Sequence, residues 1–240
     1  TDVLASDVTL NGLQGGENLA TSGTGSISSK NVGSGKTVTL GSLALGNGSG
    51  GTPGTVTNYT FTGGTHTFDV TTRNVTFSGT RVYDGTTTVN ASDLTTINNL
   101  VGSETLTFNG SGTVASGSVG TGKSITNGSL ALVSGTGSVS NYNLTTGTYD
   151  ITQRWVNFSG SRAYDATTSV SNSVLTMSNL VSGETLGVSG SGTMTTATIG
   201  AGKSVSVGTL ALANGSGLAS NYTFGTLSVN ITQKLIKPHK

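Results

Sequence analysis

One block of about 80 residues recurs along the chain, and this repeat constrains the fold more than any other feature. The segment VTFSGTRVYDGTT at 75–87 returns as VNFSGSRAYDATT at 156–168. The motifs NNLVGSETL, VGTGKSIT and SNYNL follow it in the same order in each block, with small substitutions. The equivalent glutamates Glu104 and Glu184 lie 80 residues apart. Self-similarity at a fixed period indicates a row of similar modules, each packed mainly against its neighbours.

The repeat predicts three units. Residues 1–73 form a first repeat that lacks its first strand, the one carrying FSGxRxYDxTT, and residues 74–153 and 154–234 form two complete repeats. Residues 235–240 are a C-terminal tail or the start of a next unit. These boundaries are a convention, because the first strand of a repeat could instead pack with the preceding one. Since the sequence opens within the pattern and without Met, we expect a piece of a longer chain.

Short runs of alternating apolar and polar residues, such as SITNGSLALV at 124–133, are typical of β-strands. Only 9% of residues are charged, against about 25% in ordinary globular proteins. Abundant Val, Ile and Thr favour folded β-structure over disorder. We therefore predict an all-β protein of tandem small β-sandwich (Ig-like) repeats, arranged as an elongated rod. The one helical candidate lies within 90–101, where Ser92 or Asp93 could cap a turn or two.

The segment GSVGTGKS at 117–124 formally matches the phosphate-binding pattern GxxxxGK[ST]. Lys30 and Ala197 replace its first glycine in the other two copies, and the following residues predict strand rather than helix. A phosphate loop needs a helix N-terminus behind it. We therefore interpret the segment as a Gly-rich β-turn that ends in a lysine, and we expect no cofactor.

Scarce polar residues recur at fixed places in the repeats. They are Glu17, Glu104 and Glu184; Lys36, Lys123 and Lys203; Asn58, Asn141 and Asn221; and the pairs Tyr83–Asp84 and Tyr164–Asp165. We assign them structural roles, with the asparagine and aspartate side chains closing turns. One alternative is a Lys–Asn isopeptide bond assisted by the glutamate, which needs a buried lysine of lowered pKa. Another is a calcium site at the aspartates, which needs several convergent oxygen ligands.

A few further side chains have open interpretations. Arg81 and its counterpart in the third repeat could pair with the following aspartate or pack over the tyrosines. Trp155 occurs once, at a boundary between units, where we expect it to pack between domains, with sugar binding as the alternative. His66 and His239 are isolated, and the chain contains no cysteine, so neither histidine suggests a metal or a catalytic site.

The segments RVYDGTT at 81–87 and RAYDATT at 162–168 resemble the opening of the YDG repeats of large bacterial surface adhesins. The later VGTGKSIT, SNYNL and YDITQR segments fit the same repeat in order. Such repeats occur in filamentous-haemagglutinin-like, two-partner-secreted proteins and related biofilm adhesins. Ala166 stands where the motif has glycine, which predicts that this position does not require a positive φ. The resemblance implies an extracellular, array-forming, non-catalytic module at the bacterial cell surface.

These observations lead to a functional hypothesis. We expect a non-catalytic stalk of a secreted surface adhesin, whose partners are neighbouring repeats of the same chain. The alternative is a module that binds extracellular polysaccharide or host glycan within a biofilm matrix. The net charge of +1 gives no reason to expect nucleic acid, and no apolar run approaches the roughly 20 residues of a membrane span. We expect no enzyme, because glycosidase chemistry needs paired carboxylates and only ten acidic residues are scattered along the chain.

Overall fold

The computed structural model describes residues 1–61 and 66–237. Over these residues the chain consists of β-strands, turns and single-turn 3-10 helices, without an α-helix, so the all-β prediction is confirmed. None of the helices in the described part is long and apolar enough to cross a membrane. The helical candidate within 90–101 is one 3-10 turn, and Asn90 rather than Ser92 or Asp93 is its N-cap.

The strands follow one another closely along the chain. Those of the first repeat are β1 (Asp2–Leu4), β2 (Ala20–Ser22), β3 (Thr24–Ile27), β4 (Gly33–Thr39), β5 (Ala44–Gly46) and β6 (Thr67–Val70). Those of the second are β7 (Arg73–Val82), β8 (Thr88–Asn90), β9 (Leu94–Asn98), β10 (Leu106–Asn109), β11 (Ser111–Val114), β12 (Gly120–Thr126), β13 (Ala131–Ser134) and β14 (Tyr142–Thr152). Those of the third are β15 (Arg154–Ala163), β16 (Ser169–Ser171), β17 (Leu175–Ser178), β18 (Leu186–Ser189), β19 (Ser191–Thr193), β20 (Gly200–Ser204), β21 (Ala211–Asn214) and β22 (Tyr222–Thr232).

Within residues 1–61 and 66–237, six 3-10 helices occupy two recurring positions of the repeats. They are η1 (Ala5–Asp7), η2 (Val56–Asn58), η3 (Ala91–Asp93), η4 (Val139–Asn141), η5 (Asn172–Val174) and η6 (Ala219–Asn221). The even-numbered ones end on the recurring asparagine that precedes tyrosine. In the second and third repeats this turn directly precedes the last strand, β14 or β22, and it sets the direction of the asparagine side chain there.

The chain divides into two compact units that cut across the sequence repeats. Unit 1 comprises Thr1–Val75, Asn99–Thr107 and Leu132–Thr145, and unit 2 comprises Thr76–Asn98, Phe108–Ala131 and Thr146–Lys240. Unit 1 thus contains the boundary between the first and second repeats, and unit 2 contains the boundary between the second and third. We call each such boundary region a junction. The unit boundaries proposed from the repeat stay a prediction.

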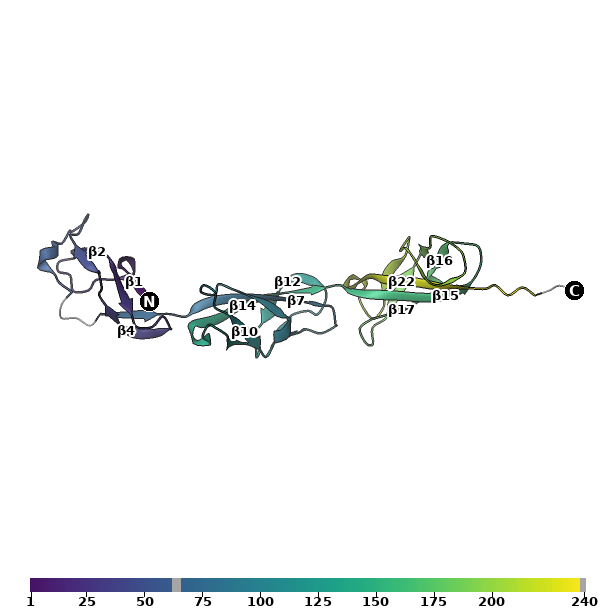
Figure 1. Cartoon of the computed structure of the whole chain (residues 1–240), viewed down its shortest axis with the longest axis horizontal. Coiled ribbons are helices and arrows are strands. Elements are labelled where there is room, and N and C mark those ends of the chain that lie inside the picture. The colour runs from purple at the N-terminus through teal and green to yellow at the C-terminus, as the bar shows by residue number, and fades with distance from the viewer. Residues whose placement is uncertain (62–65, 238–240) are drawn as a thin grey trace. The chain divides into compact units, whose positions relative to one another are not determined.

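The main sheet of the third repeat has the strand order β17-β15-β22-β20. Its central strands β15 and β22 pair in parallel, from Arg154 opposite Tyr222 to Ala163 opposite Thr232, and they lie side by side in Figure 1. A parallel pair requires a crossover connection, which here consists of nearly the whole repeat. The second repeat places β14 next to β7 in the same way. The tandem Ig-like sandwich and its arrangement as a rod stay predictions.

The core follows the two-residue period of the strands. Val156 and Phe158 of β15 alternate with more exposed neighbours and are 0% and 2% exposed. In unit 2 one buried cluster includes Tyr83 and Ile151 of the second repeat together with Tyr222 of the third. The apolar core therefore continues through the junction rather than ending at each repeat.

Candidate functional site at the repeat junction

The junction in unit 2 is organised by the carboxylate of Glu184. Its Oε1 accepts a hydrogen bond of 2.5 Å from the Tyr83 hydroxyl, and its Oε2 accepts one of 2.5 Å from the Tyr222 hydroxyl. Tyr83 follows β7 of the second repeat, whereas Glu184 and Tyr222 belong to the third. The two tyrosine rings meet edge to face, with centroids 5.4 Å apart. One carboxylate thus joins two successive repeats through charge-assisted hydrogen bonds.

Asn221 makes the second polar connection of this junction. Its side chain is 2% exposed, and its Oδ1 accepts a hydrogen bond of 2.9 Å from the backbone N–H of Val119. The 3-10 turn before it is closed by the Asn221 N–H, which donates to the carbonyl of Leu218. An amide of the third repeat therefore satisfies a backbone donor of the second, as a buried polar group requires.

Two residues at the link between these repeats add further bonds. The Gln153 side chain donates to the carbonyls of Ser220 and Tyr222, at 3.2 and 3.1 Å. The Arg154 guanidinium donates to the carbonyl and the Oδ1 of Asn179, at 2.6 and 2.8 Å. Asn179 has a φ of 67°, a backbone conformation that asparagine adopts more readily than most residues. The link is thus fixed by its own side chains as well as by its strands.

Unit 1 repeats this arrangement at the junction between the first and second repeats. Glu104 accepts from the Tyr142 hydroxyl at 2.6 Å and from the Lys30 ammonium at 2.6 Å. Asn141 Oδ1 accepts from the backbone N–H of Val32 at 2.9 Å. A lysine of the first repeat therefore takes the place that a tyrosine hydroxyl holds in unit 2. The same glutamate, tyrosine and asparagine positions build both junctions.

The junction shifts the acid–base behaviour of its members. Burial, followed by the hydrogen bond to Glu184, raises the pKa of Tyr222 to about 12, and the same causes raise the pKa of Tyr83. In unit 1 the hydrogen bonds from Lys30 and Tyr142 lower the pKa of the Glu104 carboxyl. The folded junctions therefore favour neutral tyrosines, and the junction in unit 1 favours an ionised Glu104.

We expect the stability of unit 2 to fall as the pH rises from about 10 to about 12. An unfolded tyrosine loses its proton near 10, whereas folded Tyr222 keeps it to about 12, so the unfolded state binds fewer protons in this window. Urea denaturation at pH 8, 10 and 11 measures the effect. Tyr222→Phe should reduce the pH-dependent loss, whereas Tyr164→Phe, at an exposed tyrosine, should not. Equal pH slopes in all three proteins would contradict the assignment.

The recurring lysines Lys36, Lys123 and Lys203 lie in strands β4, β12 and β20, next to an irregularity in strand register. The Lys203 ammonium donates to Thr196 Oγ1 at 2.8 Å and to the Thr198 carbonyl at 2.6 Å. Asn141 and Asn221 instead accept from backbone donors at the junctions. Lys203 and Asn221, the lysine and the asparagine of the isopeptide hypothesis in the third repeat, thus have different partners. Lys123 lies within a strand, whereas a phosphate loop would place it before a helix.

The YDG motif itself forms a tight turn at the end of the first strand. Asp84 Oδ1 accepts from the Thr86 N–H at 2.9 Å, and Asp165 Oδ1 accepts from the Thr167 N–H at 2.9 Å, which are Asx-turn bonds. Arg81 Nη1 donates to Asp84 Oδ2 at 3.0 Å, and its guanidinium lies 5.8 Å from the centre of the Tyr149 ring. Arg81 therefore makes the predicted contact with the following aspartate, and the ring next to its guanidinium is that of Tyr149 rather than that of the recurring Tyr83. Arg162 contacts Asp165 in the same way.

The prediction that the position after Asp165 does not require a positive φ is wrong. Ala166 has a φ of 64° and its counterpart Gly85 a φ of 80°, so the Asx-turn imposes the left-handed conformation in both repeats. An L-residue other than glycine is strained there. Ala166 therefore adopts the left-handed conformation in spite of the strain.

We therefore expect Ala166→Gly to stabilise the protein by about 0.5–1 kcal/mol, since relief of the left-handed strain outweighs the extra freedom of glycine in the unfolded chain. Gly85→Ala is the matched reverse change. It should be destabilising, because its new Cβ would also lie 3.0 Å from Val181 Cγ1. Thermal denaturation of both variants measures these effects. Loss of stability in Ala166→Gly would refute the strain argument.

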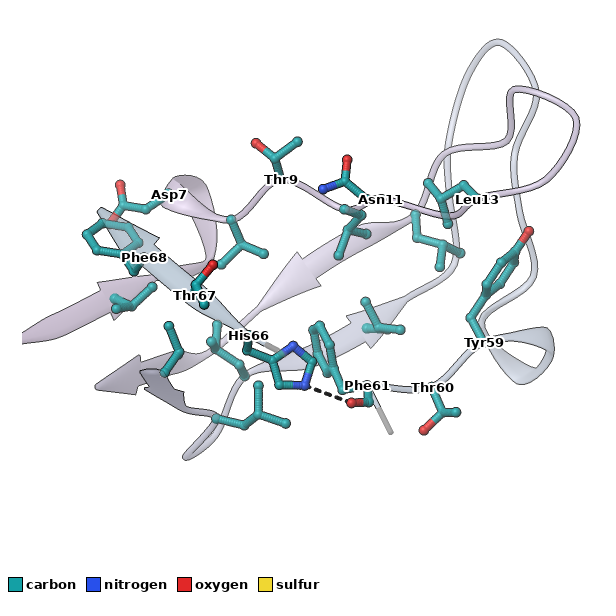
Figure 2. Close-up of a pocket in the computed structure, with 18 of the residues that line it drawn as sticks. Asp7, Thr9, Asn11, Leu13, Tyr59, Thr60, Phe61, His66, Thr67 and Phe68 are labelled. Atoms are coloured by element: carbon teal, nitrogen blue, oxygen red, sulfur yellow. Dashed lines mark hydrogen bonds between the residues drawn. The ribbon is translucent and has the colours of Figure 1, made fainter. Parts of the chain in front are cut away.

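The structure describes two of the three other residues discussed from the sequence, Trp155 and His66. Trp155 is 68% exposed, so the prediction that it packs between domains is wrong, because its strand turns this side chain to the surface. His66 Nε2 forms a hydrogen bond of 2.8 Å with the carbonyl of Phe61 (Figure 2). His239 lies outside the described residues.

Comparison with known proteins agrees with the repeat. The family model of the YDG domain matches residues 66–149 and again 151–229, which together make up more than half of the chain. No curated protein and no solved structure matches the chain. Each matched segment contains one Tyr–Asp motif, one junction glutamate and one asparagine–tyrosine pair of the junctions. The chain belongs to the YDG domain family.

Proposed function

We propose that this chain is a non-catalytic stalk region of a secreted bacterial surface adhesin. Its repeats act as tandem, sandwich-like β-modules in an elongated array that spaces an adhesive region from the cell. In this role the chain is extracellular, and its partners are neighbouring repeats. The observation that carries the proposal is the recurrence of one junction, built by Glu104, Tyr142 and Asn141 in unit 1 and by Glu184, Tyr222 and Asn221 in unit 2.

A spacer must keep successive modules in a fixed relation under load, and the chemistry of the junctions suits this task. In unit 2 the link between the second and third repeats combines a continuous apolar core, a carboxylate shared by Tyr83 and Tyr222, and the buried amide of Asn221. These hydrogen bonds are directional and are made by buried side chains, so they oppose hinge motion at the link. The same arrangement recurs in two different junctions, which favours a structural function over a binding or catalytic site in a single module.

Scattering tests the array. A chain with residues 74–153 duplicated should show, by small-angle X-ray scattering, a maximum dimension increased by one module length over the parent chain. The scattering should also show an unchanged cross-section. A duplicated chain whose maximum dimension grows only with the cube root of its mass would reject an array and with it the spacer role.

One observation favours a second candidate function, glycan binding. Trp155 is 68% exposed, and exposed tryptophan rings are common contact surfaces for sugars because they present a large apolar face. The test is a glycan-array screen of the protein and of Trp155→Ala. Binding of extracellular polysaccharide or host glycan that is lost in the variant would support this candidate, and an array without bound glycan would reject it.

A further inference from the structure

The central ladder of the third repeat joins the strand by which the chain enters the repeat to the strand by which it leaves. β15 and β22 pair in parallel at nine positions, from Arg154 with Tyr222 to Ala163 with Thr232. The antiparallel pairing of β15 with β17 covers four positions, and that of β22 with β20 covers three. The longest ladder of this sheet therefore lies between the first and last strands of the repeat.

The parallel direction decides how a pull on the chain loads this ladder. Because both strands run the same way, the start of β15 and the end of β22 lie at opposite ends of the ladder. A pull that separates Arg154 from Thr232 therefore acts along the strands and slides one past the other. The bonds of a parallel ladder are evenly spaced, so in this shear geometry they carry the load together. A pull across the strands would instead break them one after another.

The position of the ladder in the sheet limits the access of water to its hydrogen bonds. β15 and β22 are the central strands in the order β17-β15-β22-β20, so neither has a free edge. Their inward side chains include Phe158, Val229 and Ile231, which are at most 2% exposed. Neighbouring strands on both sides and the core on one face therefore hinder water from replacing a ladder bond that breaks under load.

Further hydrogen bonds close the ladder where its regular pairing is interrupted and where it ends. The register shifts at Asn157, and there the Asn157 Oδ1 accepts from the Thr226 N–H at 2.8 Å. Beyond the last pair, the Tyr164 N–H donates to the Thr232 carbonyl at 2.9 Å. The two strands are thus also connected at the positions where the regular ladder is missing.

The second repeat has the same arrangement of its first and last strands. β14 lies next to β7 in the sheet. Near the start of both strands the Thr145 hydroxyl donates to the Val75 carbonyl at 2.7 Å. At their other end the Tyr83 N–H donates to the Thr152 carbonyl at 2.9 Å. Start meets start and end meets end, as in a parallel pair, so the arrangement belongs to the repeat and not to one copy of it.

We propose that the parallel ladder between the first and last strands of a repeat is a mechanical clamp, which keeps the repeat folded when the chain is pulled along its length. In the third repeat the load passes from β15 to β22 across the ladder and bypasses residues 164–221, which connect the two strands. This inference deepens the proposed spacer function and rests on it for the source of the load. The resistance of the ladder is a property of the repeat and can be measured by itself.

Force spectroscopy of the 240-residue protein tests the clamp by pulling on the same ladder in two directions. The chain contains no cysteine, so two introduced cysteines define the points of attachment. Trp155→Cys with Gln233→Cys places the handles at opposite ends of the ladder and loads it in shear. Ala163→Cys with Gln233→Cys places both handles at the same end and peels the strands apart. All three positions are exposed, so the replacements should leave the fold intact.

The two variants differ in the direction of the load and are otherwise matched. Each should lengthen by about 250 Å when the repeat unfolds, because the greater number of residues between the shear handles is offset by the length of the ladder that they already span. At one loading rate we expect the rupture force in shear to be at least about twice that in peeling, since forced unfolding follows the unfolding barrier and shear requires many bonds to break together. Thermal denaturation without load should give equal midpoints for both variants.

Equal rupture forces in the two directions, with equal thermal midpoints, would overturn the clamp. This result is distinguishable from a failure of the spacer function, which is decided by scattering of the duplicated chain. A chain that scatters as an array but ruptures equally in both directions keeps the spacer function and loses the clamp. A chain that does not scatter as an array but resists shear more than peeling keeps the clamp and loses the spacer function.

Discussion

Gly110→Ala is expected to destabilise the second repeat by about 3–4 kcal/mol, from left-handed strain and from overpacking against the backbone. Gly110 has a φ of 78°, and a Cβ at this position would lie well under 3.0 Å from the carbonyl carbon and oxygen of Ser129. Ser129 cannot move away easily, because its N–H donates to the Ser111 carbonyl at 2.9 Å. The new methyl group therefore forces apart the backbones of Gly110 and Ser129, which the hydrogen bond between Ser129 and Ser111 holds close together.

Gly122→Ala is the matched control for this substitution. Gly122 has a φ of 63°, but a Cβ there meets nothing within 4 Å, so only backbone strain of about 1 kcal/mol is added. Urea denaturation of both variants, followed by circular dichroism, separates the two contributions as a difference in transition midpoint. If the two alanines cost the same, close approach to Ser129 is not what makes glycine necessary at Gly110.

Asn221→Leu is expected to cost about 1–3 kcal/mol, since it leaves the partly buried Val119 N–H without its acceptor. Leucine keeps the number and the branching of the side-chain heavy atoms, so the substitution removes the amide without opening a cavity. Its first consequence is local: the Val119 amide hydrogen should exchange with solvent at least tenfold faster, because the junction opens more often.

Asn58→Leu is the corresponding change at the exposed asparagine of the first repeat, and it should alter the free energy of unfolding by less than about 0.5 kcal/mol. Urea denaturation and amide hydrogen exchange of both variants give the comparison. Unchanged protection of the Val119 amide in Asn221→Leu would show that the side chain does not hold the junction.

Much of the fold could be predicted because it depends on local patterns. Alternating residues specify strands, Asn-Gly and Gly-rich pairs specify turns, and the Tyr–Asp motif specifies an Asx-turn. Phe77, Ile151 and Phe158 stand at alternating positions of their strands and are buried. Their burial follows from the two-residue strand period alone.

For two aromatic residues the local sequence does not decide burial, because burial there depends on the neighbouring repeat. Tyr164 shares its motif with Tyr83 but is 38% exposed, because Tyr83 is buried by the next repeat and not by its own. Trp155 was expected to pack between domains because it lies at a boundary between units, but it is 68% exposed. The prediction for Ala166 failed for another reason. Alanine suggested a position without a positive φ, but the turn imposes a positive φ that alanine adopts at a cost in free energy.

By itself, the sequence determined the repeat, the all-β class, the places of the turns and the set of recurring polar residues, since each depends on residues close together in the chain. Only the tertiary structure decided that the first and last strands of a repeat pair in parallel and that Glu184, Tyr222 and Asn221 meet Tyr83 and Val119. These pairings join residues 38 to 102 positions apart. Packing and hydrogen bonding select such partners in three dimensions, and no local pattern encodes them.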